Sequence, residues 1–312
     1  MSLSLNEAAK LALDNGDTKL AGIMAQWAEE SDVQRMMRFM GISGNSVTWN
    51  LEGELPDVGF RGVGEDWQDS EGVFNPQKES LAILGGEIKV DRFLVKTMGE
   101  EAAVTDQVTL KTKSLSQTFT QSLLYGSTLT DPASIDGLQT RITETSQLLA
   151  NGATANGDAL SLVNLDTAID AVANPNAIIM SRAMKRKFSA AYRDGTFPNL
   201  MLQPDDTGRH VLHYNDLPIL TGYGPGKNTP ILPFTEANPG GGTATGTSIY
   251  VVNFGDDGLM GISNGGIMYQ EIRENSDHPI QTVRLEWYVG ILRKSEFAAS
   301  RLWGIKDAAI VH

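Results

Sequence analysis

The chain has 312 residues, 41% of them hydrophobic, and a formal net charge of −13 at pH 7. This acidic balance argues against general nucleic-acid binding, which needs Lys and Arg to displace counterions, although an acidic wall can still enclose DNA. The absence of cysteine excludes disulfides and cysteine-based metal sites. Because no signal peptide or span of roughly 20 apolar residues is visible, we expect a protein made and used in a cytoplasm, with no membrane partner.

The first 40 residues have the pattern of three short amphipathic helices. Ser4 and Glu7 have the spacing of a capping box at the start of the first helix. Ser31 and Gln34 have the same spacing before the third. The apolar residues of that third helix are Met36, Met37, Phe39 and Met40. Short helices bury little apolar surface by themselves, so these three need another surface to pack against. That surface is either the core of the same chain or a neighbouring subunit.

Residues 46–90 have the pattern of a long hairpin punctuated by glycine. Val47, Trp49 and Leu51 alternate with polar residues, and the alternation returns at Leu81. A two-stranded hairpin alone is marginally stable in water. We therefore expect it either to return to its own sheet or to lie across another chain.

The remaining pattern mixes helices with antiparallel strands, which indicates an α+β fold. The longest helix is expected over 104–125, with Gly126 at its end and with Val104, Val108, Leu115, Phe119 and Leu123 on one face. Strands are expected at 177–180, 209–221 and 248–274. Residues 280–293 predict one long strand, and 297–305 predict a short helical turn with Gly304 at its C-terminal cap. The residues that give the long strand a buried face at period two are Val283, Leu285, Trp287, Val289 and Ile291.

Residues 261–265 match the G-x-S-x-G pattern of a serine hydrolase, with Ser263 as the nucleophile. Asp277, His278 and His312 follow in triad order. The hydrolase motif must join a strand to a helix, whereas strand-like residues stand on both sides here. Asn264-Gly265 is typical of a tight hairpin turn. The pattern therefore favours a turn over a catalytic serine.

Other polar groupings give no catalytic, cofactor or metal residues. His210 and His213 would point to opposite faces of a strand, and the pairs at 205–206 and 256–257 are typical turn formers, with a weak Ca²⁺ site as the alternative. The one basic cluster is Arg182, Lys185, Arg186 and Lys187 on a predicted helix. It is either a solvated face, a contact with an acidic patch of a neighbour, or a nucleic-acid contact.

The end of the chain resembles that of tailed-bacteriophage major capsid proteins with the Hong Kong ninety-seven-type fold. Members commonly close with a long strand carrying Arg and an aromatic residue, then an Ala-rich turn ending in Arg-Leu-x-Gly-Ile, as at 301–305. The order of elements elsewhere is similar, including the returning half of the hairpin at 75–90, the segment 215–220, and Val252-Asn253-Phe254-Gly255-Asp256.

The resemblance implies a phage major capsid fold. Its parts would be an N-terminal arm (1–45), an extended loop (46–90), a peripheral domain with a spine helix (91–135), an axial domain (136–265) and a C-terminal return to the peripheral domain (266–312). It implies a non-enzymatic shell subunit that assembles through pentamers and hexamers around the double-stranded DNA of a tailed phage, with no cofactor. An encapsulin-type compartment, a hydrolase using Ser263 and a monomeric binding module are the alternatives.

The same resemblance implies partners and interface residues. The partners would be further copies of the chain, a separate scaffolding protein, a portal protein, a decoration protein, and packaged DNA without sequence-specific contacts. Some relatives join subunits through a Lys–Asn bond, but no Lys lies between Phe60 and Phe74, so no such cross-link is expected. The candidate interface residues are Trp49, Phe60, Arg61, Glu65, Trp67, Arg284, Trp287, Arg301 and Trp303.

Overall fold

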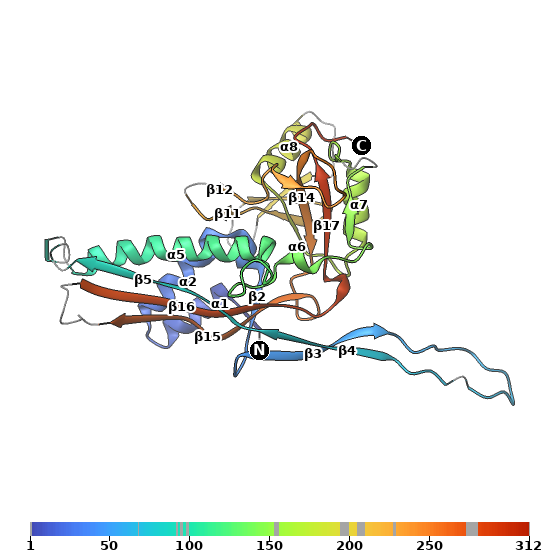
Figure 1. Cartoon of the computed structure of the whole chain (residues 1–312), viewed down its shortest axis with the longest axis horizontal. Helices are drawn as coiled ribbons and strands as arrows, with labels where there is room; N and C mark the ends of the chain where they lie inside the picture. Colours follow the sequence, from blue (N-terminus) through green and yellow to red (C-terminus); the bar gives the residue numbers. More distant parts are fainter. Residues whose placement is uncertain are drawn as a thin grey trace.

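The computed structural model describes residues 2–67, 69–91, 93, 96–97, 100–152, 156–193, 200–204, 210–226, 229–272 and 280–311 (Figure 1). Its helices are α1 (Leu5–Asp14), α2 (Thr18–Glu30), α3 (Asp32–Met36), α5 (Glu100–Tyr125), α6 (Leu138–Arg141), α7 (Leu162–Asp170), α8 (Arg182–Arg193) and the 3₁₀ helix η1 (Glu296–Ala298). Its strands are β1 (Ser2–Ser4), β2 (Arg38–Gly41), β3 (Ser46–Glu54), β4 (Val73–Ser80), β5 (Ala82–Asp91), β6 (Leu148–Ala150), β7 (Ala177–Ile179), β8 (Leu200–Pro204), β9 (His210–Tyr214), β10 (Leu217–Leu220), β11 (Tyr223–Gly224), β12 (Thr229–Pro230), β13 (Glu236–Ala237), β14 (Thr245–Val252), β15 (Leu259–Ile272), β16 (Ile280–Arg293) and β17 (Ala299–Ile305).

The N-terminal helices pack on the core of their own chain. The capping box of Ser4 and Glu7 is confirmed. Trp27 of α2 is fully buried, and its ring lies 5.0 Å from that of Trp287 on β16 in an edge-to-face arrangement. Of the two surfaces expected for these helices, the structure therefore shows the chain's own core.

The third helix is shorter than expected. It ends at Met36, and Phe39 and Met40 lie in strand β2 instead. Ser31 makes no capping hydrogen bond with its side chain. Its hydroxyl lies 3.0 Å from that of Thr120 on α5, while the Gln34 amide donates to Ser116 O at 2.6 Å. The expected cap is therefore wrong because α5 supplies these side chains with buried partners.

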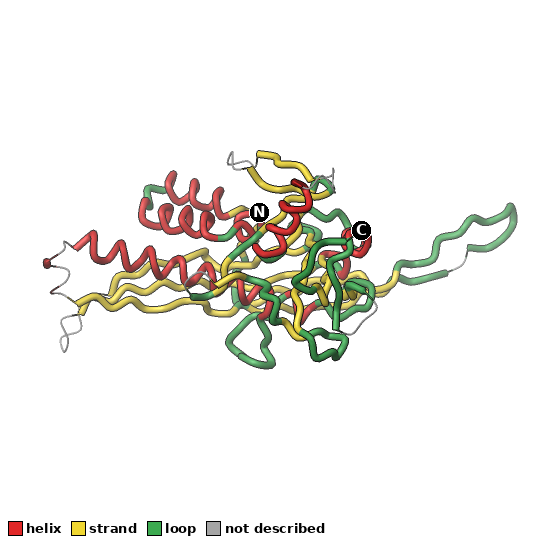
Figure 2. The backbone as a smooth tube through the Cα atoms, turned by 90° about the horizontal axis from the view of Figure 1, so that it is seen from above, coloured by secondary structure: helices red, strands yellow, loops and turns green. Residues whose placement is uncertain are grey.

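A five-stranded sheet in the order β1-β2-β15-β16-β5 forms the long axis of the body. β16 pairs antiparallel with both β15 and β5, which confirms the long strand expected over 280–293. Helix α5 runs along these strands (Figure 2). The α5 residues buried in the core shared with this sheet are Val104, Val108, Leu115, Phe119, Leu123 and Leu124, and all but Leu124 were predicted.

The second sheet has eight strands, in the order β6-β17-β14-β7-β10-β9-β8 with β13 beside β14. Its central strands are buried on both faces. Ile249 and Val251 of β14 belong to the core beneath α7 and α8, whereas Tyr250 and Val252 belong to the core shared with α5. The expected strand around 177–180 is confirmed as β7 at the centre of this sheet.

The helical turn expected over 297–305 is wrong. Only η1 is helical, and β17 pairs with β14 and β6 in the eight-stranded sheet. All seven β17 residues are buried, and a short strand buried on both faces shows no alternation that separates it from a helix. Gly304 has a positive φ of 78°, but it lies inside β17 and does not cap a helix. The end of the chain therefore lies in the eight-stranded sheet and not beside β16.

Two glycines form the crossing from α5 to α6. The Gly137 N–H donates to the Gly126 carbonyl at 2.9 Å. A Cβ on Gly126 would lie 2.1 Å from the Ile135 carbonyl oxygen, and one on Gly137 would lie 2.6 Å from that of Ser122. Only glycine lets the backbone around residue 126 lie this close to the backbone around residue 137. Helix α5 stops at Tyr125, which confirms that Gly126 ends the long helix.

Candidate subunit interface

The hairpin leaves the body and forms a two-stranded sheet of its own. β3 and β4 pair antiparallel from Ser46 opposite Ser80 to Glu54 opposite Val73. The loop 55–72 extends beyond them, away from both larger sheets (Figure 1). The chain then returns to the body as β5, so only this last segment of the expected hairpin region joins a larger sheet.

The outer part of the hairpin exposes large apolar side chains. Phe60 and Val63 are fully exposed, at 109% and 110%. The other exposed apolar residues here are Leu55, Val58, Trp67, Val73 and Phe74. Soluble monomers rarely expose apolar side chains so densely, and such patches mark interaction sites. Phe60 and Trp67 were candidates from the sequence. The other five were missed, and their signal was apolar residues within an acidic, glycine-rich segment.

Three of the predicted candidates meet at the tip of the hairpin. Arg61 donates to the Glu65 carbonyl at 2.7 Å, and its guanidinium lies 5.2 Å from the centroid of the Trp67 ring. The Glu65 carboxylate accepts from the Gly62 N–H at 2.9 Å. These contacts hold the turn in one shape, which reduces the ordering cost of docking.

The base of the hairpin is fixed to the body. Trp49 of β3 packs against a small cluster formed by Met260, Ile262 and Leu292. On β4, the Glu79 carboxylate lies 2.6 Å from Arg141 of α6, with both side chains largely buried. The hairpin therefore projects in a defined direction. Trp49 belongs to this support and not to the exposed tip.

The four C-terminal candidates have different surroundings. Arg284 lies on the polar face of β16, 2.6 Å from Glu87, and this hydrogen bond lowers the pKa of the Glu87 carboxyl. Trp287 is buried among the rings of Trp27, Phe39 and Phe119. Arg301 and Trp303 lie in β17 and are buried. Among these four, Arg284 has the most accessible side chain.

Arg301 belongs to a buried polar network that joins the eight-stranded sheet to the end of helix α5. Its guanidinium lies 3.5 Å from the Glu236 carboxylate on β13, and its Nε donates to Ser248 on β14 at 3.1 Å. Tyr125, at the end of α5, donates its hydroxyl to the same Glu236. Burial, together with the Glu236 carboxylate, raises the pKa of Tyr125 well above its ordinary value. This network was not predicted, because its members come from four separate elements.

Ser263 lies within a strand and not at a strand-to-helix turn. Residues 261–265 lie inside the continuous strand β15, where the pairing with β16 shifts between Ser263 and Ile267. They form neither a strand-to-helix elbow nor the expected hairpin turn. The Ser263 hydroxyl accepts from Trp287 Nε1 at 3.1 Å and from the Gly266 N–H at 3.2 Å. Asp277, His278 and His312 lie outside the described residues.

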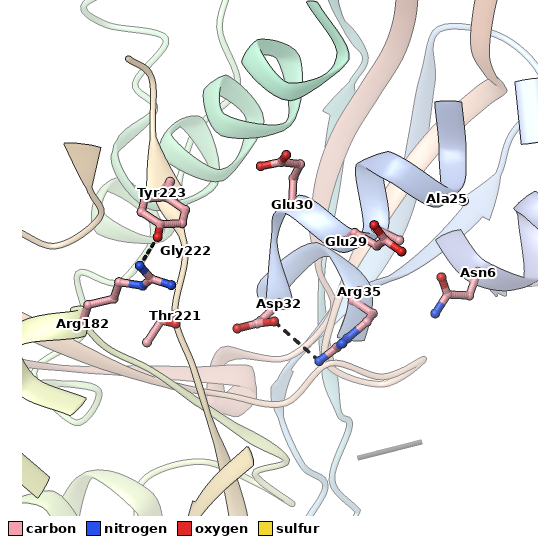
Figure 3. Close-up of a pocket in the computed structure, with 11 residues that line it drawn as sticks. Asn6, Ala25, Glu29, Glu30, Asp32, Arg35, Arg182, Thr221, Gly222 and Tyr223 are labelled. Carbon is pink, nitrogen blue, oxygen red and sulfur yellow. Dashed lines mark hydrogen bonds and ion pairs between the residues drawn. The ribbon is translucent and has the colours of Figure 1, made fainter. Parts of the chain in front are cut away.

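A polar cavity of about 650 Å³ lies between the N-terminal helices and the eight-stranded sheet (Figure 3). Arg182 stacks over Tyr223 on one side, and Asp32 pairs with Arg35 on the other. Within the described part of the chain, no group of three or more His, Asp or Glu side chains is placed to hold a metal ion. The cavity is therefore lined by paired charges.

Comparison with known proteins defines the class of this molecule. The fold is similar to that of the holo-SrpI encapsulin complex from Synechococcus elongatus, with a TM-score of 0.64 and 14% identity over 90% of this chain and 89% of that one. It is also similar to the cyanophage A-1(L) capsid, with a TM-score of 0.61 and 13% identity over 88% of this chain and 93% of that one. For Mycobacterium phage Bobi, the TM-score is 0.59 and the identity 11% over 90% and 91% of the two chains. The fold is therefore that of phage capsid subunits, which an encapsulin shares.

Part of the sequence matches a known protein family. Residues 18–160 match the family model of major capsid protein GP7. This part of the chain is therefore similar to a family of major capsid proteins, and the whole chain has the fold of phage capsid subunits. No curated protein matches the sequence. Among the described residues, no helix is long and apolar enough to cross a membrane.

Proposed function

We propose that this chain assembles through pentamers and hexamers into an icosahedral shell that encloses the double-stranded DNA of a tailed phage. Assembly would take place in the host cytoplasm. The exposed apolar hairpin tip carries the proposal, because it lies at the end of a firmly supported projection and has no partner within the described part of the chain. A tip of this kind is suited to burial against a further copy. The Phe60, Arg61, Glu65 and Trp67 side chains would contact that copy directly.

Other parts of the structure have proposed roles within this shell. The five-stranded sheet with α5 would form the peripheral domain, and the eight-stranded sheet, including β17, the axial domain. Arg284 would contact a neighbour across the exposed face of β16, whereas Trp49, Trp287, Arg301 and Trp303 would act by supporting the subunit. A separate scaffolding protein, a portal protein, a decoration protein and DNA held without base-specific contacts would complete the particle.

Particle size tests the proposal. We expect the purified chain, alone or co-expressed with a scaffolding protein, to form closed shells or five- and six-membered rings in negative-stain electron microscopy, with matching sizes by light scattering. A chain that stays at 33.7 kDa under both conditions and at high concentration would contradict it.

An encapsulin-type compartment is the second candidate, because an encapsulin shares the fold over most of the chain. The two candidates differ in what the shell encloses. Nuclease-protected double-stranded DNA inside particles from infected cells would support the phage shell. Particles that instead retain one folded enzyme and no DNA would support the compartment.

Mature shells should contain no covalent bond between subunits formed by hairpin lysines. Lys78 lies on β4, opposite Thr48 near the base of the hairpin, and the loop 55–72 contains no lysine. We expect boiled particles to give one band near 33.7 kDa on a denaturing gel. A ladder of multiples that disappears in a Lys78→Arg variant would show that this prediction is wrong.

A further inference from the structure

Helix α8 carries a one-sided positive charge. Between Arg182 and Arg193 it has five cations and no acidic residue. Arg182 is turned toward Tyr223 at the cavity of Figure 3, and Lys187 pairs with Asp307. Arg186 and Arg193 are exposed, seven positions apart on one helical face, and the neighbouring Tyr192 is 47% exposed. This basic face, Arg186 with Tyr192 and Arg193, points away from the core.

Helix α7 presents the opposite charge. Residues 142–181 contain four acidic side chains and no Lys or Arg. Asp170 is exposed at the end of α7, and Val163, which is seven positions earlier on the same face, is 64% exposed. Val163 and Asp170 together form an acidic flank. Like the basic face of α8, this flank has one large exposed side chain beside a charged side chain.

The two helices cover one face of the eight-stranded sheet but lie on opposite sides of β14 and β17 (Figure 1). The end of the chain runs between them. Lys187 on α8 donates to the Ala308 carbonyl at 2.7 Å, and the Leu162 N–H of α7 donates to the Val311 carbonyl at 3.1 Å. The opposite charges therefore lie on two separate helices, with the end of the chain between them.

We propose that the basic face of α8 in one copy docks on the acidic flank of α7 in the next copy around a ring. Two different surfaces of one subunit are what a head-to-tail ring contact requires. Complementary charge fixes the orientation of such a contact, and Tyr192 against Val163 adds apolar area. The inference rests on the proposed function, since it names which surfaces join neighbours within a pentamer or hexamer.

Charge exchange between the two helices tests the contact. Arg186→Glu or Asp170→Arg alone places like charges opposite each other. We expect each to raise the concentration needed for ring assembly about tenfold or more. The double variant in one chain restores opposite charges at every contact and should assemble as the parent does. Lys10→Glu, an exposed reversal on α1, is the matched control and should have no effect.

Mixing the two single variants gives a sharper result. In a ring where the Arg186→Glu and Asp170→Arg copies alternate, the two substituted side chains would meet at one contact and the two original side chains at the next. Both contacts then join opposite charges, but alternation closes only in rings with an even number of subunits. We therefore expect the mixture to form hexamers but not pentamers, as counted by native mass spectrometry.

Each other outcome has a separate meaning. If the parent assembles and both single variants assemble equally well, or if the double variant is not restored, the docking proposal is overturned. Particles of Arg186→Glu that form normally but lose nucleic acid would overturn it in favour of a nucleic-acid contact. If the parent never assembles, even with scaffold, the proposed function fails first and this contact with it. Unchanged thermal unfolding of each monomer excludes misfolding as the cause.

Discussion

Replacing Phe60 and Trp67 together by Ser should leave a folded subunit that no longer assembles. Both side chains lie on the exposed hairpin tip, at 109% and 64% exposure, so neither supports the core. An interface anchor of this kind contributes about 2 kcal/mol. Losing two should raise the concentration needed for assembly on the order of 100- to 1,000-fold. Light scattering across a concentration series measures the change.

The matched control for this variant changes two exposed leucines elsewhere. Leu13 and Leu129 are 57% and 91% exposed, and neither lies on the hairpin. The Leu13→Ser, Leu129→Ser variant should assemble as the parent does. Equal loss of assembly in both variants would show that general surface polarity, and not the hairpin tip, controls association.

Replacing Trp287 by Ala should have the opposite effect, with a loss of stability before any loss of assembly. Trp287 is 2% exposed and lies within 5.0–5.2 Å, between ring centroids, of Trp27, Phe39 and Phe119. Truncating a buried aromatic side chain costs about 3–5 kcal/mol. It would also leave Ser263 without the indole donor. Urea unfolding of the monomer should show a lower midpoint.

Trp67→Ala is the same chemical change at an exposed site and serves as the comparison. We expect its free energy of unfolding to stay within about 1 kcal/mol of the parent value, since only the contact with Arg61 is lost. If the Trp67 variant were the less stable of the two, the hairpin would have to pack on the body and the proposed division between support and contact residues would be wrong.

The spacing of apolar residues was sufficient to predict two long elements that each have one face toward water. The long strand β16 and helix α5 each bury the residues that their spacing indicated. The N-terminal capping box was also visible, because Ser4 and Glu7 satisfy each other within one turn. These features depend on neighbours in sequence, or on a regular apolar spacing, and both can be read from a single chain.

Strands with both faces buried were identified less reliably, since β7 was expected from the sequence but β17 was not. Every residue of β17 is buried, so its composition suggested a short helical turn. The interface candidates were limited for a related reason. Trp287 and Arg301 were chosen by residue type, yet only the three-dimensional packing shows that one is surrounded by aromatic rings and the other by a carboxylate and hydroxyls.

The buried network of Arg301, Glu236 and Tyr125 has a mechanical consequence. Sliding α5 over the eight-stranded sheet would separate the Tyr125 hydroxyl from the Glu236 carboxylate, and a hydrogen bond to a charged group contributes about 1.5–3 kcal/mol. Because α5 packs on the five-stranded sheet, the two sheets should move as one stiff plate. A shell built from such plates must take up its curvature where the plates join, so the angle between neighbouring subunits would vary while the shape of each subunit body stays constant.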